Sequence, residues 1–298
     1  MNANTFNPTP NLSSLPATPT GAQRSIGDIL ISIGRLSVED AARIMQRQQK
    51  ENLKFGDAAI AMKLLTKEDI DLALSCQFDY VYLSGQDTSL SPELVAAYKP
   101  FSRVGENLRA VRSQLMLRWF NTDPARKVLA VVSPGKDEGR SFIAANRAIV
   151  FAQQGERTLL IDGDLRTARQ QALFKLERSV GLSGILAGRA GLEATWPVPS
   201  LPGLNVLPAG AVPPNPQELL GRNAFGALLH AATLQFDVII IDTPAGGDFA
   251  DAEIIAARAG AALMIARKNT SLVPAAAKLA GRLQDGGVAL IGSVLNDD

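Results

Sequence analysis

The chain has 298 residues, 46% hydrophobic and 20% charged, which is enough to bury one large or two modest hydrophobic cores. Its 30 Lys and Arg against 29 Asp and Glu give a formal net charge of +1, which excludes a bulk positive field, and no nucleic acid partner is expected. One cysteine and one histidine exclude an internal disulfide and a multi-histidine zinc site, and we expect a cytoplasmic protein.

Residues 1–23 contain several prolines and lack the basic start and apolar run of a signal peptide, so we expect a disordered leader. The most apolar runs elsewhere, such as 128–132 and 238–241, are far shorter than the roughly 20 residues that cross a bilayer. Membrane association would therefore require a partner.

A small helical repeat domain is predicted over 24–84. Residues 26–40 (IGDILISIGRLSVED) and 55–69 (FGDAAIAMKLLTKED) are two copies of one pattern. In each copy an apolar helical stretch is followed by Ser37 or Thr66, which can N-cap a second helix. The pattern predicts two helix–turn–helix units.

This layout resembles the N-terminal domain of type II secretion and pilus ATPases, a docking module that in some members binds cyclic di-GMP. Members that bind this ligand open each copy with Arg-Leu-Gly. The corresponding residues here are Ser-Ile-Gly at 25–27 and Lys-Phe-Gly at 54–56, with Arg24 one place out of register. We therefore expect a protein-docking module, with cyclic di-GMP binding as the alternative, and a flexible linker over 85–100.

Residues 101–298 alternate strand-like apolar runs with helical stretches, which is typical of an α/β fold with a mostly parallel sheet and helices on both faces. The first strand leads into a loop and then a helix over 142–155 that ends at a glycine, the order found in P-loop proteins. The predicted strands are 128–133, 157–166, 205–210, 236–244, 261–267 and 288–296.

The loop PGKDEGRS (134–141) departs from the general phosphate loop, G-x-x-x-x-G-K-[ST], at two places: Pro134 replaces the first glycine and Arg140 replaces the lysine. A guanidinium keeps the positive charge but is planar and bulkier than an ammonium group. We still predict a phosphate site, in which Lys136 is either a second cation or a solvated loop residue. The residues expected to bind nucleotide are Gly135, Lys136, Asp137, Glu138, Gly139, Arg140, Ser141 and Phe142.

Acidic residues lie at the ends of two predicted strands. Asp162 and Asp164 end one strand with a spacing that points both to the same side, and Asp242 ends another, as a Walker B carboxylate does. Carboxylates in these places suit magnesium binding and proton transfer.

Together these residues resemble the bacterial tyrosine kinases of exopolysaccharide export, in particular the EpsG-type chain-length determinant protein tyrosine kinase. The resemblance covers about 95–298 and implies a P-loop fold of the MinD and ParA branch, with in-line transfer of the ATP γ-phosphoryl group to tyrosine. Its most specific segments are LPGLNVLPAGAVPPNPQELL (201–220), DVIIIDTP (237–244), LLIDGDLR (159–166) and Glu106-x-x-Arg109-x-x-Arg112.

The resemblance also implies roles for single residues. Ser141 and Asp242 would hold Mg²⁺, with Asp164 as a further acid beside the metal. Asp162 would be the catalytic base that accepts the tyrosine hydroxyl proton, and Arg140 would take the place of the lysine on the phosphates.

Two further assignments come from the same resemblance. In the family, the helix that carries Glu106, Arg109 and Arg112 packs neighbouring subunits into a ring, so we expect a homo-oligomer. A solvated charged helix face is the alternative. Asn296, in the last predicted strand, resembles an adenine-side position.

Family members usually carry a tyrosine-rich tail after the last strand as phosphoacceptor, whereas this sequence ends at Asn-Asp-Asp, 296–298. Its tyrosines are Tyr80, Tyr82 and Tyr98, and we expect Tyr98 to be the most accessible. The family also works with a membrane-bound polysaccharide chain-length regulator, whose cytoplasmic tail would recruit this chain to the inner membrane.

Two other functions compete with a kinase. Arg140 and the missing tyrosine tail favour a nucleotide-gated assembly scaffold of the export machinery with little kinase activity. A ParA- or MinD-like positioning ATPase fits the fold, but its signature lysine would fall at Gly135.

Overall fold

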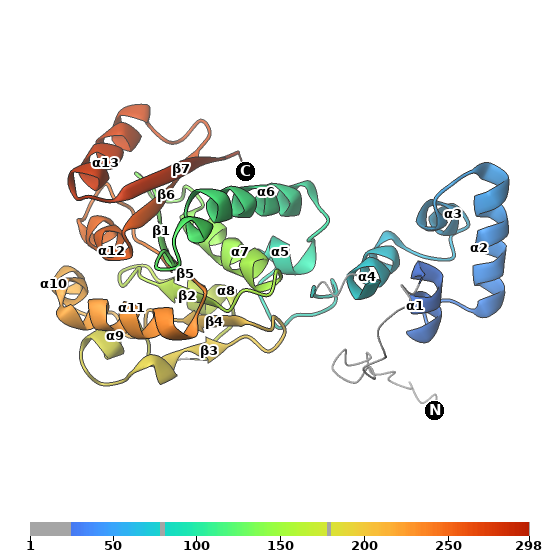
Figure 1. Cartoon of the computed structure of the whole chain (residues 1–298), viewed down its shortest axis with the longest axis horizontal. Helices are drawn as coiled ribbons and strands as arrows, with labels where there is room; N and C mark the ends of the chain where they lie inside the picture. Colours follow the sequence, from blue (N-terminus) through green and yellow to red (C-terminus); the bar gives the residue numbers. More distant parts are fainter. Residues whose placement is uncertain (1–24, 78–80, 178–179, 298) are drawn as a thin grey trace, which may run out of the picture. The chain divides into compact units, whose positions relative to one another are not determined.

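The structure, a computed structural model, describes residues 25–77, 81–177 and 180–297 (Figure 1). The predicted leader, 1–23, lies outside these ranges. The chain divides into two compact units after Tyr80. Within the described part, no helix combines the length and the hydrophobicity that crossing a membrane requires.

The first unit is a small bundle of four helices, as the internal repeat predicts. Each repeat begins with a short helix and continues into a capped second one: the Ser37 hydroxyl accepts a hydrogen bond from the Asp40 N–H, and Thr66 and Asp69 bond reciprocally. Leu30 and Ile44 are fully buried in its core. The helices are α1 (Ile26–Ser32), α2 (Val38–Glu51), α3 (Phe55–Ala61) and α4 (Lys67–Gln77).

The second unit is built on a seven-stranded sheet in the order β3-β4-β2-β5-β1-β6-β7, parallel except for β3, which pairs antiparallel with β4. The six predicted strands are present, most of them one to four residues shorter than expected, and the short edge strand β3 was not predicted. The strands are β1 (Val128–Val132), β2 (Thr158–Asp162), β3 (Trp196–Pro197), β4 (Leu204–Leu207), β5 (Val238–Asp242), β6 (Ala261–Arg267) and β7 (Ala289–Asn296).

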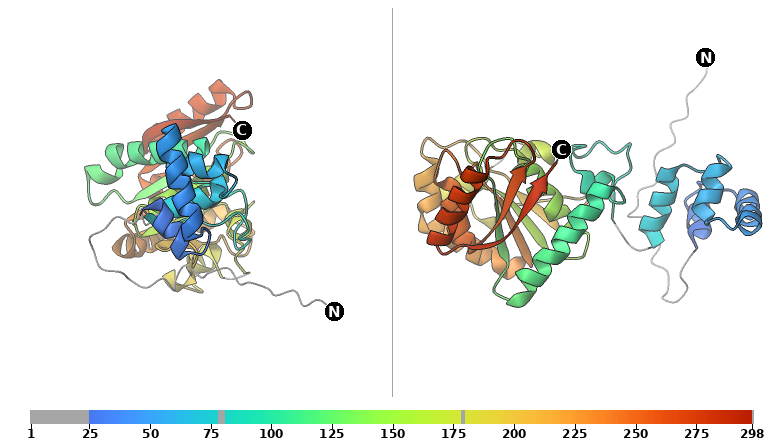
Figure 2. Two further views of the ribbon diagram at one scale, coloured as in Figure 1. Left: turned by 90° about the vertical axis from the view of Figure 1, so that its right-hand side faces the viewer. Right: turned by 90° about the horizontal axis from the view of Figure 1, so that it is seen from above.

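Helices cover both faces of this sheet, so its central strands are buried throughout. Alternate residues of β1 enter two separate cores: Leu129 packs with α5, α6 and α7, and Ala130 packs with α9 to α13. Figure 2 shows α6 and α13 on opposite sides of the sheet. The helices are α5 (Val95–Tyr98), α6 (Arg103–Arg118), η2 (Phe120–Thr122), α7 (Arg140–Ala152), α8 (Gln170–Leu173), α9 (Leu182–Leu186), η3 (Leu192–Ala194), α10 (Pro216–Gly221), α11 (Asn223–Gln235), α12 (Asp251–Ala259) and α13 (Val273–Asp285).

Residues 85–100, predicted as a flexible linker, are instead part of the second unit. Leu90 and Leu94 are buried in the core beneath α7. The buried Asn146 of α7 accepts a hydrogen bond from the Ala96 N–H at 2.8 Å, and its amide group donates to the Glu93 carbonyl at 3.2 Å. This packing is not visible in the sequence, because a short apolar run between proline and serine residues shows no helical or strand period.

Of the two tyrosines that the structure describes, Tyr98 is the more accessible, as expected, but it is half-buried. Its hydroxyl donates to the Leu90 carbonyl and accepts from the Leu90 N–H, and burial raises the pKa of its phenol. Tyr82 is buried, with 9% of its surface exposed, and Tyr80 lies outside the described residues. The hydrogen bonds of the Tyr98 phenol and the burial of Tyr82 make these two tyrosines poor phosphoacceptors in this conformation.

Replacing Asn146 with alanine is expected to release residues 93–98 from α7. The variant leaves the Ala96 N–H without its acceptor and the Glu93 carbonyl without a donor, at a cost of about 1–3 kcal/mol. Urea denaturation measures that loss, and hydrogen exchange locates it at the Ala96 amide. The exposed Gln154→Ala is the matched control. Unchanged protection of the Ala96 amide would show that this segment is held by other contacts.

Candidate active site

The candidate site lies at the carboxyl edge of the sheet, where β1, β5 and β2 end side by side. The parallel register places Asp162 of β2 directly opposite Asp242 of β5. Gly163 follows Asp162, and a Cβ atom at this glycine would lie 2.6 Å from the Asp242 carbonyl oxygen. The glycine therefore permits the close approach that brings the two strand ends together.

The predicted phosphate loop joins β1 to α7 and is held from within by Glu138. Only 3% of Glu138 is exposed, and its carboxylate accepts hydrogen bonds from the Gly135 N–H at 2.8 Å and from the Ser271 hydroxyl. Asp137 and Gly139 have positive φ angles of 56° and 86° and form the turn into α7. Glu138, expected to bind nucleotide, therefore holds the loop in shape in this state.

Other predicted nucleotide residues are also engaged within the chain. Lys136 pairs with Asp248, which follows β5, at 2.9 Å between Nζ and Oδ2, and 69% of its side chain is exposed. Both predictions for this lysine, a second cation on the phosphates and a solvated loop residue, stay open. Phe142, in the first turn of α7, is half-buried and packs against the core on the α7 side of the sheet.

Arg140 points inward and lies between the acidic side chains of the site. Its guanidinium donates to the Ser133 hydroxyl at 2.8 Å, and it is 3.4 Å from Asp242 Oδ1 and 3.5 Å from Asp164 Oδ2. Arg140 is 9% exposed, so this charge is largely removed from water. A guanidinium so placed neutralises the carboxylates that would otherwise repel one another.

Asp162 is fully buried and accepts hydrogen bonds from the N–H groups of Asp164, Arg169 and Gln170 at 2.9–3.2 Å. Burial raises its pKa well above the usual aspartate range, and the charge of Asp242 raises it further. Burial also raises the pKa of Asp242, although the Arg140 charge opposes that shift. A carboxyl with a raised pKa is a stronger base than an exposed aspartate.

Gln170 of α8 was not predicted, yet it joins the site. Its amide group donates to Asp242 Oδ2 at 2.8 Å and to the Ser141 carbonyl at 3.1 Å, and the residue is fully buried. Its amide oxygen has no hydrogen-bond partner among the described residues. A neutral glutamine in a short polar helix carries no charge or spacing signal, so only the fold reveals it.

A second unpredicted pair fixes the segment after Asp164. Arg166 donates to the buried Asp251 at 2.6 Å, and its guanidinium lies 3.7 Å from the centre of the Phe249 ring. Asp164 itself accepts hydrogen bonds from the Arg166 and Thr167 N–H groups and from the Thr167 hydroxyl. These contacts hold Asp164 with its carboxylate toward Arg140.

The residues expected to bind Mg²⁺ are suited to it. Asp242 Oδ1 is buried and accepts no hydrogen bond from the described residues, Ser141 lies beside it, and Asp164 is joined to it through Arg140. The described part of the chain has no group of three or more His, Cys, Asp or Glu side chains that could hold a metal ion. This donor set fits Mg²⁺ that is held by few protein ligands together with phosphate oxygens.

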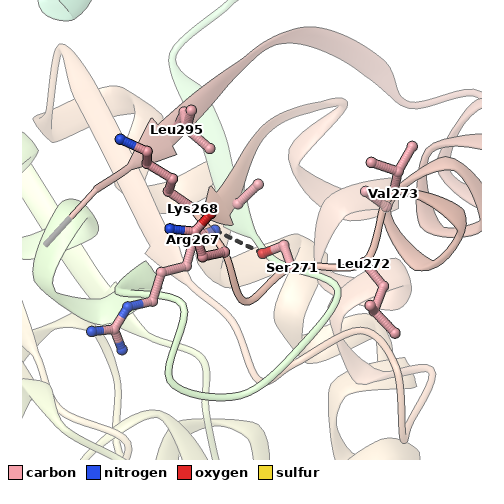
Figure 3. Close-up of a pocket in the computed structure, with 9 residues that line it drawn as sticks. Arg267, Lys268, Ser271, Leu272, Val273 and Leu295 are labelled. Atoms are coloured by element: carbon pink, nitrogen blue, oxygen red, sulfur yellow. Dashed lines mark hydrogen bonds between the residues drawn. The ribbon is translucent and has the colours of Figure 1, made fainter.

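Asn296 ends β7 against the phosphate loop, and its amide group donates to the Glu138 carbonyl at 3.3 Å. Nearby, Arg267 of β6 donates to the Asp137 carbonyl at 3.0 Å, and its N–H donates to the Ser271 hydroxyl at 2.7 Å. A cavity of about 250 Å³ lies beside Arg267 and Ser271 and is also lined by Leu272, Val273 and Leu295. Figure 3 shows these side chains. The position expected for the adenine side thus adjoins both the loop and a cavity.

The three charged residues of α6 lie on one helix, as their spacing predicts, but the arginines bind their own domain. Arg109 donates to the Pro100 carbonyl at 2.6 Å and pairs with Glu106 at 2.6 Å. Arg112 donates to the Val150 carbonyl of α7 at 3.2 Å. In the ion pair of Glu106 with Arg109, Glu106 is the more exposed residue, with 69% of its side chain accessible against 18% for Arg109.

The raised pKa of Asp162 predicts how stability depends on pH. The stability that this carboxyl contributes is complete below its unfolded-state pKa of about 3.9 and is lost as the pH rises through the higher folded-state value. Asp162→Asn cannot ionise and should lose less stability than the unmodified chain over that range, by urea denaturation from pH 4 to 8.

Asp237 is the matched control, because its contribution to stability changes with pH in the opposite direction. Arg157 lowers the pKa of Asp237, so the stability contributed by Asp237 is present above about pH 3.9 and is lost as the pH falls through its lowered value. A stability difference between the chain and Asp162→Asn that stays constant with pH would contradict the burial of an ionisable Asp162.

Comparison with known proteins places the chain among bacterial kinases. No protein-family model matches it. It is 33% identical over 203 residues to the tyrosine-protein kinase YwqD of Bacillus subtilis, which covers 68% of this chain and 85% of YwqD. The solved kinase domain of the Escherichia coli tyrosine kinase ETK is 30% identical with a TM-score of 0.66, covering 74% of this chain and 85% of that one.

Two further solved structures are similar. The chimerical protein CapA2B2 is 29% identical with a TM-score of 0.64, covering 78% of this chain and 98% of that one. The cell-division ATPase MinD of Pyrococcus furiosus is 28% identical with a TM-score of 0.50, covering 57% and 71%. The second unit thus has the expected P-loop fold of the MinD branch. The chain belongs to the family of bacterial tyrosine-protein kinases.

Proposed function

We propose that this chain is an ATP-dependent protein tyrosine kinase that regulates the chain length and export of an exopolysaccharide. The observation that carries the proposal is the meeting, at one sheet edge, of the phosphate loop with Asp162, Asp164 and Asp242. The identity to YwqD and ETK supports tyrosine as the acceptor. Transfer of radiolabel from γ-labelled ATP to a glutamate–tyrosine copolymer tests the activity, and no transfer would contradict it.

In the proposed reaction Asp162 accepts the proton of the tyrosine hydroxyl. The tyrosine oxygen bonds to the γ-phosphorus, the bond from that phosphorus to the β–γ bridging oxygen breaks, and ADP leaves with the electron pair. Arg140 would turn from the carboxylates toward the phosphates, and Ser141, Asp164 and Asp242 would hold Mg²⁺. Bound Mg²⁺ neutralises charge on the phosphate oxygens.

We also propose that a separate membrane-bound chain-length regulator recruits this cytoplasmic chain to the inner membrane through its cytoplasmic tail. The cavity of Figure 3 supports a contact with this partner, because three apolar residues around it are 64–80% exposed: Leu272, Val273 and Leu295. Binding of the tail to the full chain, and its loss in Val273→Glu, tests this contact.

The first unit is proposed to be a docking module like the N-terminal domain of type II secretion ATPases, with cyclic di-GMP as the alternative ligand. Calorimetric titration with cyclic di-GMP separates the two, since micromolar binding would favour the ligand.

The α6 residues Glu106, Arg109 and Arg112 are proposed to support homo-oligomer assembly. Glu106 is more exposed than Arg109, so light scattering of Glu106→Lys tests this assembly.

One observation favours a second candidate, a nucleotide-gated assembly scaffold with little kinase activity: Arg140 pairs with Asp164 and Asp242 instead of extending from the loop. Arg140→Lys is expected to raise phosphotransfer about tenfold, equivalent to about 1.4 kcal/mol of barrier, because the compact ammonium group reaches the phosphates more freely. ATP-dependent assembly without phosphotyrosine in both proteins would favour the scaffold.

A further inference from the structure

A second cavity, of about 440 Å³, lies at the same edge of the sheet as the candidate active site. One wall is the loop that follows β4 and contains the Pro-Pro-Asn-Pro segment (213–216), and another is α9. The register pairs Leu207, the last residue of β4, with Ile161, the residue before Asp162. The loop that forms this wall therefore leaves the sheet one strand away from β2, which carries the proposed base, and neighbouring strands are about 4.8 Å apart.

The cavity is positively charged. Arg189 and Arg222 line it, both are exposed, and none of the described residues that line it is acidic. One N–H group of Arg222 donates a hydrogen bond to the Leu186 carbonyl at 3.4 Å, and the other N–H groups of its guanidinium can bind a ligand. Two arginines without a facing carboxylate form a site for an oxygen-bearing anion, either a planar carboxylate or a tetrahedral phosphate.

A buried polar atom at the cavity also points to a ligand. Ser183 of α9 is 2% exposed and lines the cavity, and its hydroxyl has no hydrogen-bond partner among the described residues. An unpaired buried hydroxyl is costly, so it indicates that a polar group completes the site.

The walls are fixed before any ligand arrives. Pro213 and Pro214 have restricted φ angles, and the Ser183 N–H donates to the Ala209 carbonyl at 2.9 Å. A Cβ at Gly181 would lie 2.2 Å from the Pro208 carbonyl, so α9 and the loop after β4 pack too closely for any larger residue. Figure 1 shows α9, α10 and α11 grouped beside β2 and β4.

We propose that this cavity is an anion subsite that binds acidic or phosphorylated side chains next to the acceptor tyrosine in the substrate peptide. The inference rests on the proposed kinase function, because it takes the acceptor hydroxyl to be at Asp162. An extended peptide advances about 3.3 Å per residue, so a residue a few places from the acceptor reaches the next strand along the sheet edge. Arg189 and Arg222 would then select acceptors by the charge that flanks the tyrosine.

Fluorescence anisotropy of labelled peptides on the full chain, without ATP, tests the subsite. Three peptides share one tyrosine and differ in its flanks: glutamate, phosphotyrosine or glutamine. The double variant Arg189→Gln/Arg222→Gln is expected to weaken binding of the glutamate and phosphotyrosine peptides about tenfold, and to leave the glutamine peptide and ATP binding unchanged. The Arg189→Lys/Arg222→Lys variant should retain most of the affinity, and added salt should weaken it.

Arg126→Gln, an exposed arginine on another face, removes the same charge and should change nothing. Equal loss for all three peptides, or no loss in the double variant, would overturn the subsite. Preference for the glutamate peptide over the phosphotyrosine peptide, or the reverse, assigns which anion it takes. Because this readout needs no phosphotransfer, a chain that binds acidic peptides but transfers no phosphate would contradict the kinase and keep the subsite.

Discussion

Replacing Asp162 with asparagine should lower phosphotransfer to tyrosine by about 100- to 10,000-fold, the range that a positioned general base supplies. The side chain is held at the sheet edge by N–H donors from Asp164, Arg169 and Gln170, and asparagine keeps its size while losing its basicity. The effect should fall on kcat, because ATP binds through the loop and not through this carboxyl.

Calorimetric titration with ATP and Mg²⁺ should therefore give nearly the same affinity for Asp162→Asn as for the unmodified chain. Asp237→Asn is the matched control, since Asp237 pairs with Arg157 at the opposite end of β5. Phosphotransfer that is unchanged in Asp162→Asn would remove this residue from the base position, whatever the activity of the chain.

Arg140→Met should destabilise the nucleotide-free chain by about 3–5 kcal/mol, because it leaves buried carboxylates without their cation. Asp242 has 0% and Asp164 1% of its surface exposed, so water cannot replace the guanidinium that lies within 3.5 Å of both. Mg²⁺ should restore more stability to this variant than to the unmodified chain, since both cations compete for the same oxygens.

Urea denaturation in EDTA and in Mg²⁺ measures both effects. Lys136→Met is the matched control: Lys136 also belongs to the loop, but its pair with Asp248 is exposed and should contribute little. If the two variants lose the same stability, or if Mg²⁺ acts on them equally, Arg140 does not occupy the magnesium position in the absence of nucleotide.

The sheet and the carboxylates at its edge were predictable because they depend on local signals. Apolar runs that end in aspartate mark β2 and β5, and parallel pairing then brings Asp162 and Asp242 together with no further information. The fold class and the helical repeat followed from the same kind of pattern.

What the sequence missed depends on contacts between distant segments. The inward direction of Arg140 is set by Asp242 at the end of β5 and by Asp164 in the loop after β2, and Gln170 reaches Asp242 from 72 residues away. Residues 85–100 pack as they do because Asn146 offers their backbone a buried partner. None of these contacts leaves a periodic or compositional trace, so only the folded chain shows them.

Intact-mass spectrometry after incubation with ATP and Mg²⁺, with and without the cytoplasmic tail of a chain-length regulator, tests the central claim most directly. The kinase account predicts added phosphate, located on tyrosine by fragmentation, that disappears in Asp162→Asn. A chain that binds ATP yet gains no phosphate under either condition, while still assembling with nucleotide, would contradict the kinase and leave the scaffold as the function.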